Sequence, residues 1–112
     1  MTPELAPETR AFLGRRHALY VDGAAQDPAV QARLEVTDPA SGAPISSIAL
    51  GEAVDVDRAV AAARRALHGP WSRMTADERT RVLLEFSRLC DAHARQFTEI
   101  AVLDNGMPHA IA

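Results

Sequence analysis

The first half of the chain alternates between apolar and polar residues, as strands with one buried face do. The alternation runs over residues 17–23, 34–38 and 43–50. The last two segments flank Asp38-Pro-Ala-Ser-Gly42, a sequence typical of a tight turn because proline fixes φ and glycine accepts positive φ. The pattern predicts an antiparallel hairpin with the segment 17–23 as a third strand, and a loop over residues 24–33.

After Gly51 the spacing of apolar residues changes from two to about 3.6, the period of an α-helix. One apolar stripe runs over residues 56–67, and Gly69-Pro70 stops this helix. A second helix is expected to begin at Thr75-Ala-Asp-Glu78, which has the spacing of a capping box. We expect the second helix and its continuation to bury an apolar stripe that comprises Val82, Phe86, Leu89, Cys90, His93 and Phe97.

The helical pattern continues past a bend expected near His93-Ala94 and ends at Asn105-Gly106, where glycine can adopt the left-handed conformation. Residues 1–16 are polar and contain prolines, with one helical turn expected over residues 8–15, and we interpret them as an N-terminal arm. Three strands are thus followed by three helices, and residues 109–112 are expected to form the first turn of a further element. We therefore expect residues 17–112 to be an incomplete segment of a larger domain.

The composition is that of an ordinary water-soluble domain. Of the 112 residues, 47% are apolar, 24% charged and 4% aromatic. No apolar run approaches the roughly 20 residues that cross a bilayer, and residues 1–10 lack the apolar stretch of a secretory signal. The single cysteine, Cys90, has no partner for an internal disulfide. These features predict a cytoplasmic protein that does not contact membranes.

The charge pattern argues against a nucleic-acid-binding protein. All twelve basic residues are arginines, and fifteen acidic residues give a net charge of −3. The arginines over residues 64–88 alternate with acidic residues, so no basic stripe forms. The pattern favours solvated helix faces with ion pairs.

No residue of this chain is predicted to be catalytic or to bind a cofactor. Cys90 and His93 are three apart on a predicted helix, as a thiolate and its base could be, but a buried structural role is favoured because nucleophilic cysteines prefer electropositive helix N-termini. The six glycines are scattered, so no phosphate-binding loop is formed, and the histidines lack the spacing of zinc ligands. For Asp104, spacing alone favours hydrogen bonds within the Asn105-Gly106 turn.

Six short segments, in this order, resemble the N-terminal portion of the aldehyde dehydrogenase superfamily. They are Tyr20-Val-Asp-Gly23, Thr37-Asp-Pro-Ala-Ser-Gly42, Asp55-Val-Asp-Arg-Ala-Val-Ala-Ala-Ala-Arg64, Gly69-Pro-Trp-Ser-Arg73, Glu78-Arg79 and Leu103-Asp-Asn-Gly106 with Pro108. The chain departs from the family at Met107, where lysine is usual, and at Ala24-Ala25, where a charged residue and tryptophan are common.

The resemblance implies an α/β fold: the N-terminal part of an aldehyde dehydrogenase cofactor-binding domain, with short antiparallel strands followed by amphipathic helices. It implies a longer, homo-oligomeric enzyme that oxidises an aldehyde to a carboxylic acid with NAD or NADP. The family's catalytic Cys and Glu motifs lie downstream of this chain, so the chain alone is expected to be inactive. Residues 11–17 resemble members that act on phenylacetaldehyde-like or betaine-aldehyde-like substrates.

The resemblance also implies a structural monovalent cation. In the family it is held by backbone carbonyls before the turn and by the acid near the helix end, which correspond here to Val36, Thr37 and Asp104. Its other ligands would come from residues outside this chain. The alternative hypothesis is a stand-alone helical interaction module without catalytic activity, because the apolar helix faces exceed what three short strands can cover.

Overall fold

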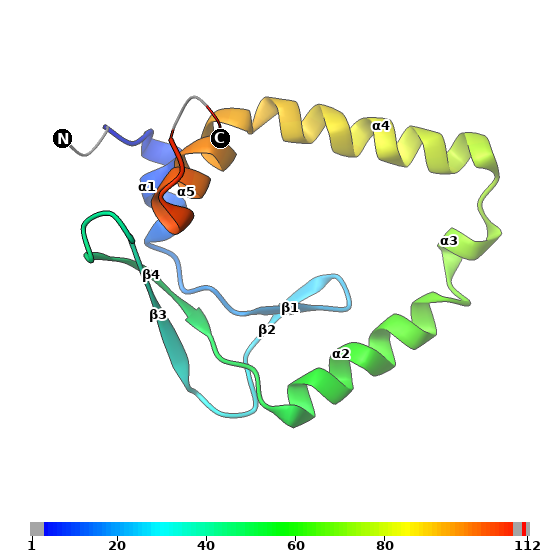
Figure 1. Ribbon diagram of the computed structural model, residues 1–112. Coiled ribbons are helices and arrows are strands. Elements are labelled where there is room, and N and C mark those ends of the chain that lie inside the picture. The colour runs from blue at the N-terminus through cyan, green and yellow to red at the C-terminus, as the bar shows by residue number, and fades with distance from the viewer. Residues whose placement is uncertain (1–3, 109–110, 112) are drawn as a thin grey trace. The chain divides into compact units, whose positions relative to one another are not determined.

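A computed structural model describes residues 4–108 and residue 111. Figure 1 shows its helices and strands along the chain. They are α1 (Pro7–Leu13), β1 (Leu19–Val21), β2 (Ala24–Gln26), β3 (Arg33–Thr37), β4 (Pro44–Ala49), α2 (Ala53–Ala66), α3 (Pro70–Arg73), α4 (Ala76–Ala92) and α5 (Ala94–Asn105). The chain divides into two compact units. The first unit draws on residues 1–17, 33–48 and 93–112, and the second on residues 18–32 and 49–92.

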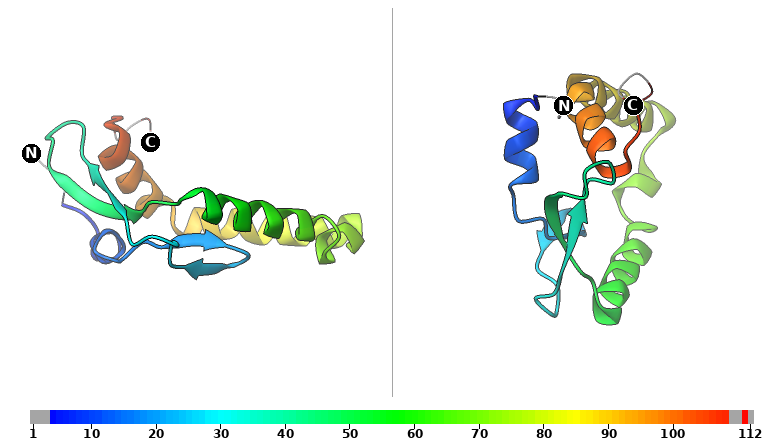
Figure 2. Two further views of the ribbon diagram at one scale, coloured as in Figure 1. Left: turned by 90° about the horizontal axis from the view of Figure 1, so that it is seen from below. Right: turned by 60° about the vertical axis from the view of Figure 1, so that its left-hand side comes forward.

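In the second unit, β1 and β2 form a two-stranded antiparallel hairpin, with Leu19 opposite Gln26. Asp22 and Gly23 both have positive φ, at 56° and 77°, as the tight turns of two-residue hairpins require. The loop predicted over residues 24–33 is therefore wrong at residues 24–26, since Asp22-Gly23 is itself a hairpin signal. Helix α2 lies along β1 (Figure 2, left).

In the first unit, β3 and β4 pair as the predicted hairpin. The Asp38 N–H donates to the Ala43 carbonyl at 2.9 Å, and the Gly42 N–H, at φ 72°, donates to the Asp38 carbonyl at 2.7 Å. The third strand predicted for this sheet is wrong: β1 pairs with β2, and the only link of this kind in the described residues is an isolated parallel bridge between His17 and Ile48.

The helix boundaries agree with the local signals in the sequence. Thr75 and Glu78 form the predicted capping box, in which the Thr75 N–H donates to the Glu78 carboxylate at 2.7 Å and the Glu78 N–H to Thr75 Oγ1 at 3.3 Å. The predicted bend separates α4 from α5 at His93. Helix α5 ends as predicted, with Gly106 at φ 71°. The short α3, which begins at Pro70, was not predicted.

The largest error concerns the apolar stripe of α4. Phe86 is 66% exposed and Val82, Leu89 and Phe97 are also exposed, as is His93, while Cys90 is half-buried. The helical period is right, but a stripe is buried only when another element packs on it. In the described part of the second unit, the most extensive packing joins α2 and β2 to β1 and does not include α4. Within the described residues, no helix is both long and apolar enough to span a bilayer.

Candidate functional site

Two turns of the first unit lie against each other. One is the Asp38–Gly42 turn between β3 and β4, and the other is the end of α5 at Gly106. A Cβ atom on Gly106 would lie 3.1 Å from Cγ of Pro39, and φ at Gly106 is 71°. Glycine is required here by both the backbone conformation and the close approach of the proline ring. This contact brings the end of β3 to the last turn of α5.

The carboxylate of Asp38 is engaged by its own turn. Ser41 Oγ donates to it at 2.6 Å and the Ala40 N–H at 2.9 Å. These hydrogen bonds, that of Ser41 above all, hold the pKa of Asp38 below its ordinary value. The Asp38 carboxylate therefore stabilises the turn, and we do not assign it to a binding site.

A cavity of about 290 Å³ opens beside these two turns. Its lining is mainly apolar and comes from α1, the β3–β4 hairpin and α5: Phe12, Leu13, His17, Val36, Ile45, Ser46, Ile48, Ile100 and Asp104. Asp104 is the one acidic side chain among these lining residues. A carboxylate at the edge of an apolar cavity favours a cation as its partner.

Asp104 lies in the last turn of α5, and its exposed side chain makes no hydrogen bond or ion pair within residues 4–108 and 111. The local hydrogen bond of the turn is made instead by its neighbour, because Asn105 Oδ1 accepts from the Met107 N–H at 3.2 Å. Of the three residues proposed to hold a cation, Val36 and Asp104 line the same cavity. Thr37 is exposed and does not belong to that lining. A backbone carbonyl and a carboxylate are hard oxygen donors, which suit a hard cation.

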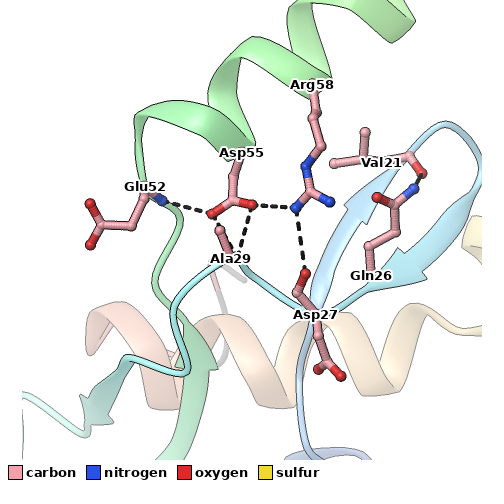
Figure 3. Close-up of polar contacts among 7 residues, drawn as sticks. All are labelled: Val21, Gln26, Asp27, Ala29, Glu52, Asp55 and Arg58. Atoms are coloured by element: carbon pink, nitrogen blue, oxygen red, sulfur yellow. Dashed lines mark hydrogen bonds and ion pairs between the residues drawn. The ribbon is translucent and has the colours of Figure 1, made fainter.

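A second polar cluster surrounds Asp55 in the first turn of α2 (Figure 3). Its carboxylate is 3% exposed and accepts from the Glu52 N–H at 2.9 Å, from the Ala29 N–H at 3.1 Å and from Arg58. The Glu52 N–H contributes most to a lowered pKa of Asp55, and Arg58 adds to it. The cluster fastens the loop at Ala29 to the start of α2. Each of its donors already has a protein acceptor, so we assign it a structural role.

A third cluster, around Glu99 in α5, was missed by sequence reasoning. Glu99 is 7% exposed and accepts from the Ala6 N–H, Thr9 Oγ1 and Arg95 Nε. The Thr9 hydroxyl and Arg95 hold the pKa of Glu99 below its ordinary value. One signal was available: Glu99 precedes the buried Leu103 by four residues, so the acid lies on the buried face of its helix.

Cys90 and His93 do not form a catalytic pair in this chain. Cys90 is half-buried near the end of α4, whereas His93 is exposed at the junction of α4 and α5. In the part of the chain that the structure describes, no group of three or more His, Cys, Asp or Glu side chains is arranged to hold a metal ion.

Comparison with known proteins places this geometry in a family. The model of the aldehyde dehydrogenase family matches residues 26–112. The chain is 40% identical over 92 residues to the mitochondrial aldehyde dehydrogenase family 2 member B4 of Arabidopsis thaliana, which covers 81% of this chain and 17% of that protein. It is 35% identical over 97 residues to the NADP/NAD-dependent aldehyde dehydrogenase PuuC of Escherichia coli, with 86% and 20% covered.

The backbone is similar to solved structures as well. The NAD+ complex of an aldehyde dehydrogenase from Bacillus cereus superposes on all of this chain with a TM-score of 0.94 at 29% identity, and 23% of that protein is covered. The α/β fold expected for the N-terminal part of the family is thus confirmed. The chain spans about a fifth of the length of the relatives that it matches. The chain belongs to the aldehyde dehydrogenase family.

Proposed function

We propose that this chain is the N-terminal portion of an enzyme that oxidises an aldehyde to a carboxylic acid with NAD or NADP, and that the 112 residues alone are inactive. The observation that carries the proposal is the backbone match over the whole chain to an aldehyde dehydrogenase that binds NAD+. The match extends to 23% of that protein, which leaves most of such an enzyme to residues outside this chain.

The inactivity of the chain alone follows from its own side chains. Its one cysteine, Cys90, is half-buried near the C-terminal end of α4, whereas nucleophilic cysteines favour helix N-termini. None of its glycines forms a phosphate-binding loop. The role that remains is to support the cofactor-binding domain.

The proposal includes a structural monovalent cation beside the cavity of the first unit. The backbone carbonyls of Val36 and Thr37 and the carboxylate of Asp104 would hold it. The unpartnered Asp104 carboxylate and its place on one cavity with Val36 support this site. When bound, the cation would neutralise Asp104 and join the end of β3 to the end of α5.

Further features of the proposal rest on the resemblance alone. Residues 11–17 make phenylacetaldehyde-like and betaine-aldehyde-like compounds the first substrates to assay. The composition and the single cysteine support a cytoplasmic enzyme. A homo-oligomer is expected from the family.

A chimera tests the proposed function. Residues 4–108 would replace the corresponding region of the Bacillus cereus enzyme, and the chain alone would be assayed beside it for aldehyde-dependent formation of NADH or NADPH. We expect the folded chimera to be active and the chain alone to be inactive. Turnover by the purified chain alone, or a folded but inactive chimera, would contradict the proposal.

The alternative, a helical interaction module without catalytic activity, is favoured by one observation: the exposed apolar stripe of α4, with Phe86 66% exposed. A module of this kind should unfold cooperatively and form a single oligomer. A chain that instead binds hydrophobic dyes and lacks fixed tertiary packing would exclude it.

A further inference from the structure

The start of helix α1 is held by a side chain from the far end of the chain. The Ala6 N–H donates to both carboxylate oxygens of Glu99, at 3.3 and 3.1 Å, and Thr9 Oγ1 donates to Oε2 at 2.5 Å. Thr9 and Ala6 are 0% and 2% exposed, which makes them the most buried residues among those of the first unit that the structure describes. The arm is therefore attached mainly through a polar contact that is shielded from water.

Helix α1 needs this contact because it cannot cap itself. Its N-cap residue is Ala6, whose side chain has no acceptor, so the N–H groups of the first turn require one from elsewhere. Glu99 supplies a charged acceptor from more than 90 positions away for Ala6 and from 90 positions away for Thr9. Arg95 Nε donates to Oε1 of Glu99 at 2.8 Å and favours the ionised carboxylate.

The C-terminal end of α1 has a weaker attachment. Ser46 Oγ on β4 donates to the Leu13 carbonyl at 2.8 Å. Phe12 and Leu13, at this end of α1, form one wall of the cavity of about 290 Å³, and Ile45 and Ile100 belong to the remaining walls. Figure 1 shows α1 beside α5, with which it packs. Release of α1 would therefore remove a wall of the cavity.

We propose that α1 is a strap and that Glu99 is its latch: the strap opens as a unit while α5 and the β3–β4 hairpin stay folded, and its opening removes the α1 wall of the apolar cavity. A helix of seven residues is too short to persist alone in water, so α1 unfolds once it leaves Glu99. The elements that remain have their own ladders and turns, which do not pass through α1. Opening is therefore local.

Hydrogen exchange of the full chain tests the latch. Glu99→Gln keeps one oxygen acceptor for the Ala6 N–H and the Thr9 hydroxyl. It removes the second oxygen acceptor and the negative charge that pairs with Arg95. The reporters in α1 are the Arg10 and Gly14 amides, which bond to Ala6 and Arg10, and the reporter in α5 is the Gly106 amide, which bonds to Val102. We expect exchange in α1 to accelerate about 10- to 100-fold, the effect of one charged hydrogen bond, and Gly106 to change less than about twofold.

Two variants accompany this measurement. Thr9→Val removes one donor with little change of shape and should accelerate α1 exchange by a smaller factor. Glu85→Gln removes an exposed acid that pairs with Arg88 in α4 and should leave α1 exchange unchanged. Trypsin should also cleave after Arg10 faster in Glu99→Gln than in Glu85→Gln.

Three results would overturn the proposal. Unchanged α1 exchange in both Glu99→Gln and Thr9→Val would show that Glu99 is no latch. Equal acceleration at Gly106 and in α1 would show that Glu99 supports the whole unit. Loss of all protection in Glu99→Gln would lead to the same conclusion, because a strap opens without the rest.

Discussion

Two buried carboxylates, Asp55 in the second unit and Glu99 in the first, bind backbone N–H groups over different distances along the chain. Asp55 accepts from Glu52, three residues before it, and from Ala29, 26 residues away. Glu99 accepts from the Ala6 N–H, 93 residues away, and from the side-chain hydroxyl of Thr9, 90 residues away. Both acids have lowered pKa values because donors surround the ionised form. Asp55 belongs to the first turn of α2 and caps the start of its own helix. Glu99 caps the start of a different helix, α1, whose N-cap residue Ala6 has no side-chain acceptor.

Glu99→Ala is expected to have the largest effect. It leaves the Ala6 N–H and the Thr9 hydroxyl without an acceptor, and each buried donor of this kind costs about 1–3 kcal/mol. The free energy of unfolding, measured with urea and circular dichroism, should fall by about 3 kcal/mol. Thr9→Val is the matched control and should lose less than half as much. If Glu99→Ala lost no more unfolding free energy than Thr9→Val, the carboxylate of Glu99 would not be the main attachment of the arm.

Asp55→Ala should lower the thermal midpoint by less than Glu99→Ala does. Arg58 is 46% exposed and can return to water, and the Glu52 N–H lies at a helix start that water can reach. The control is Asp57→Ala, which removes an exposed acid from the same helix and should have little effect. If Asp55→Ala lowered the thermal midpoint more than Glu99→Ala, the long-range contact of Glu99 with α1 would not be the more stabilising of the two.

Acid should release the arm before it unfolds the rest of the first unit. The pKa of Glu99 is lowered on folding from its ordinary value near 4.5, so its contribution is fully present above that value and is lost as the pH falls through the lower folded pKa. Exchange in α1, followed from pH 6 to pH 3, should accelerate relative to Gly106 only below about pH 4.5. Glu99→Gln should remove this dependence. A relative acceleration that persists in Glu99→Gln would assign it to another group.

Gly106→Ala extends the comparison to glycines. Gly106 and Gly42 have nearly equal φ values of 71° and 72°, but only a Cβ on Gly106 would approach Pro39. Both alanine variants should lose about 1–2 kcal/mol of unfolding free energy to backbone strain, and Gly106→Ala should lose more because Pro39 must also move. Equal losses of unfolding free energy, measured with urea, would mean that a Cβ at position 106 meets no steric resistance from Pro39.

The smallest effect is expected for Arg88→Ala. Arg88 and Glu85 form an ion pair on α4 with both side chains exposed, and such pairs contribute little because water solvates each partner. The thermal midpoint should stay within experimental error of the parent at moderate salt. A marked decrease would show that exposed pairs matter here as much as buried ones.

The sequence predicted those features that a few neighbouring residues determine. The Asp38–Gly42 turn, the Thr75 cap and the end of α5 at Gly106 all follow from hydrogen bonds or φ preferences within a few positions. The pairing of β1 with β2 was missed although Asp22-Gly23 is equally local, because residues 24–26 have no apolar alternation. The burial of Phe86 was predicted from periodicity and is wrong, since periodicity identifies a face and not its partner.

The candidate site divides in the same way. Val36 and Asp104 were named from the resemblance, and their place on one cavity depends on the approach of Gly106 to Pro39, which no local pattern reveals. Glu99 was not named at all. Its partners lie at the other end of the chain, so no window of neighbouring residues contains both halves of the contact.

By itself the sequence determined the longer helices α2, α4 and α5, the turn between β3 and β4 and the resemblance to a family, because backbone preferences and short motifs act over a few residues. Tertiary structure alone decided which carboxylates are buried and what they hold. A charged group is stable away from water only where several donors converge on it, and at Glu99 those donors come from segments that only folding brings together.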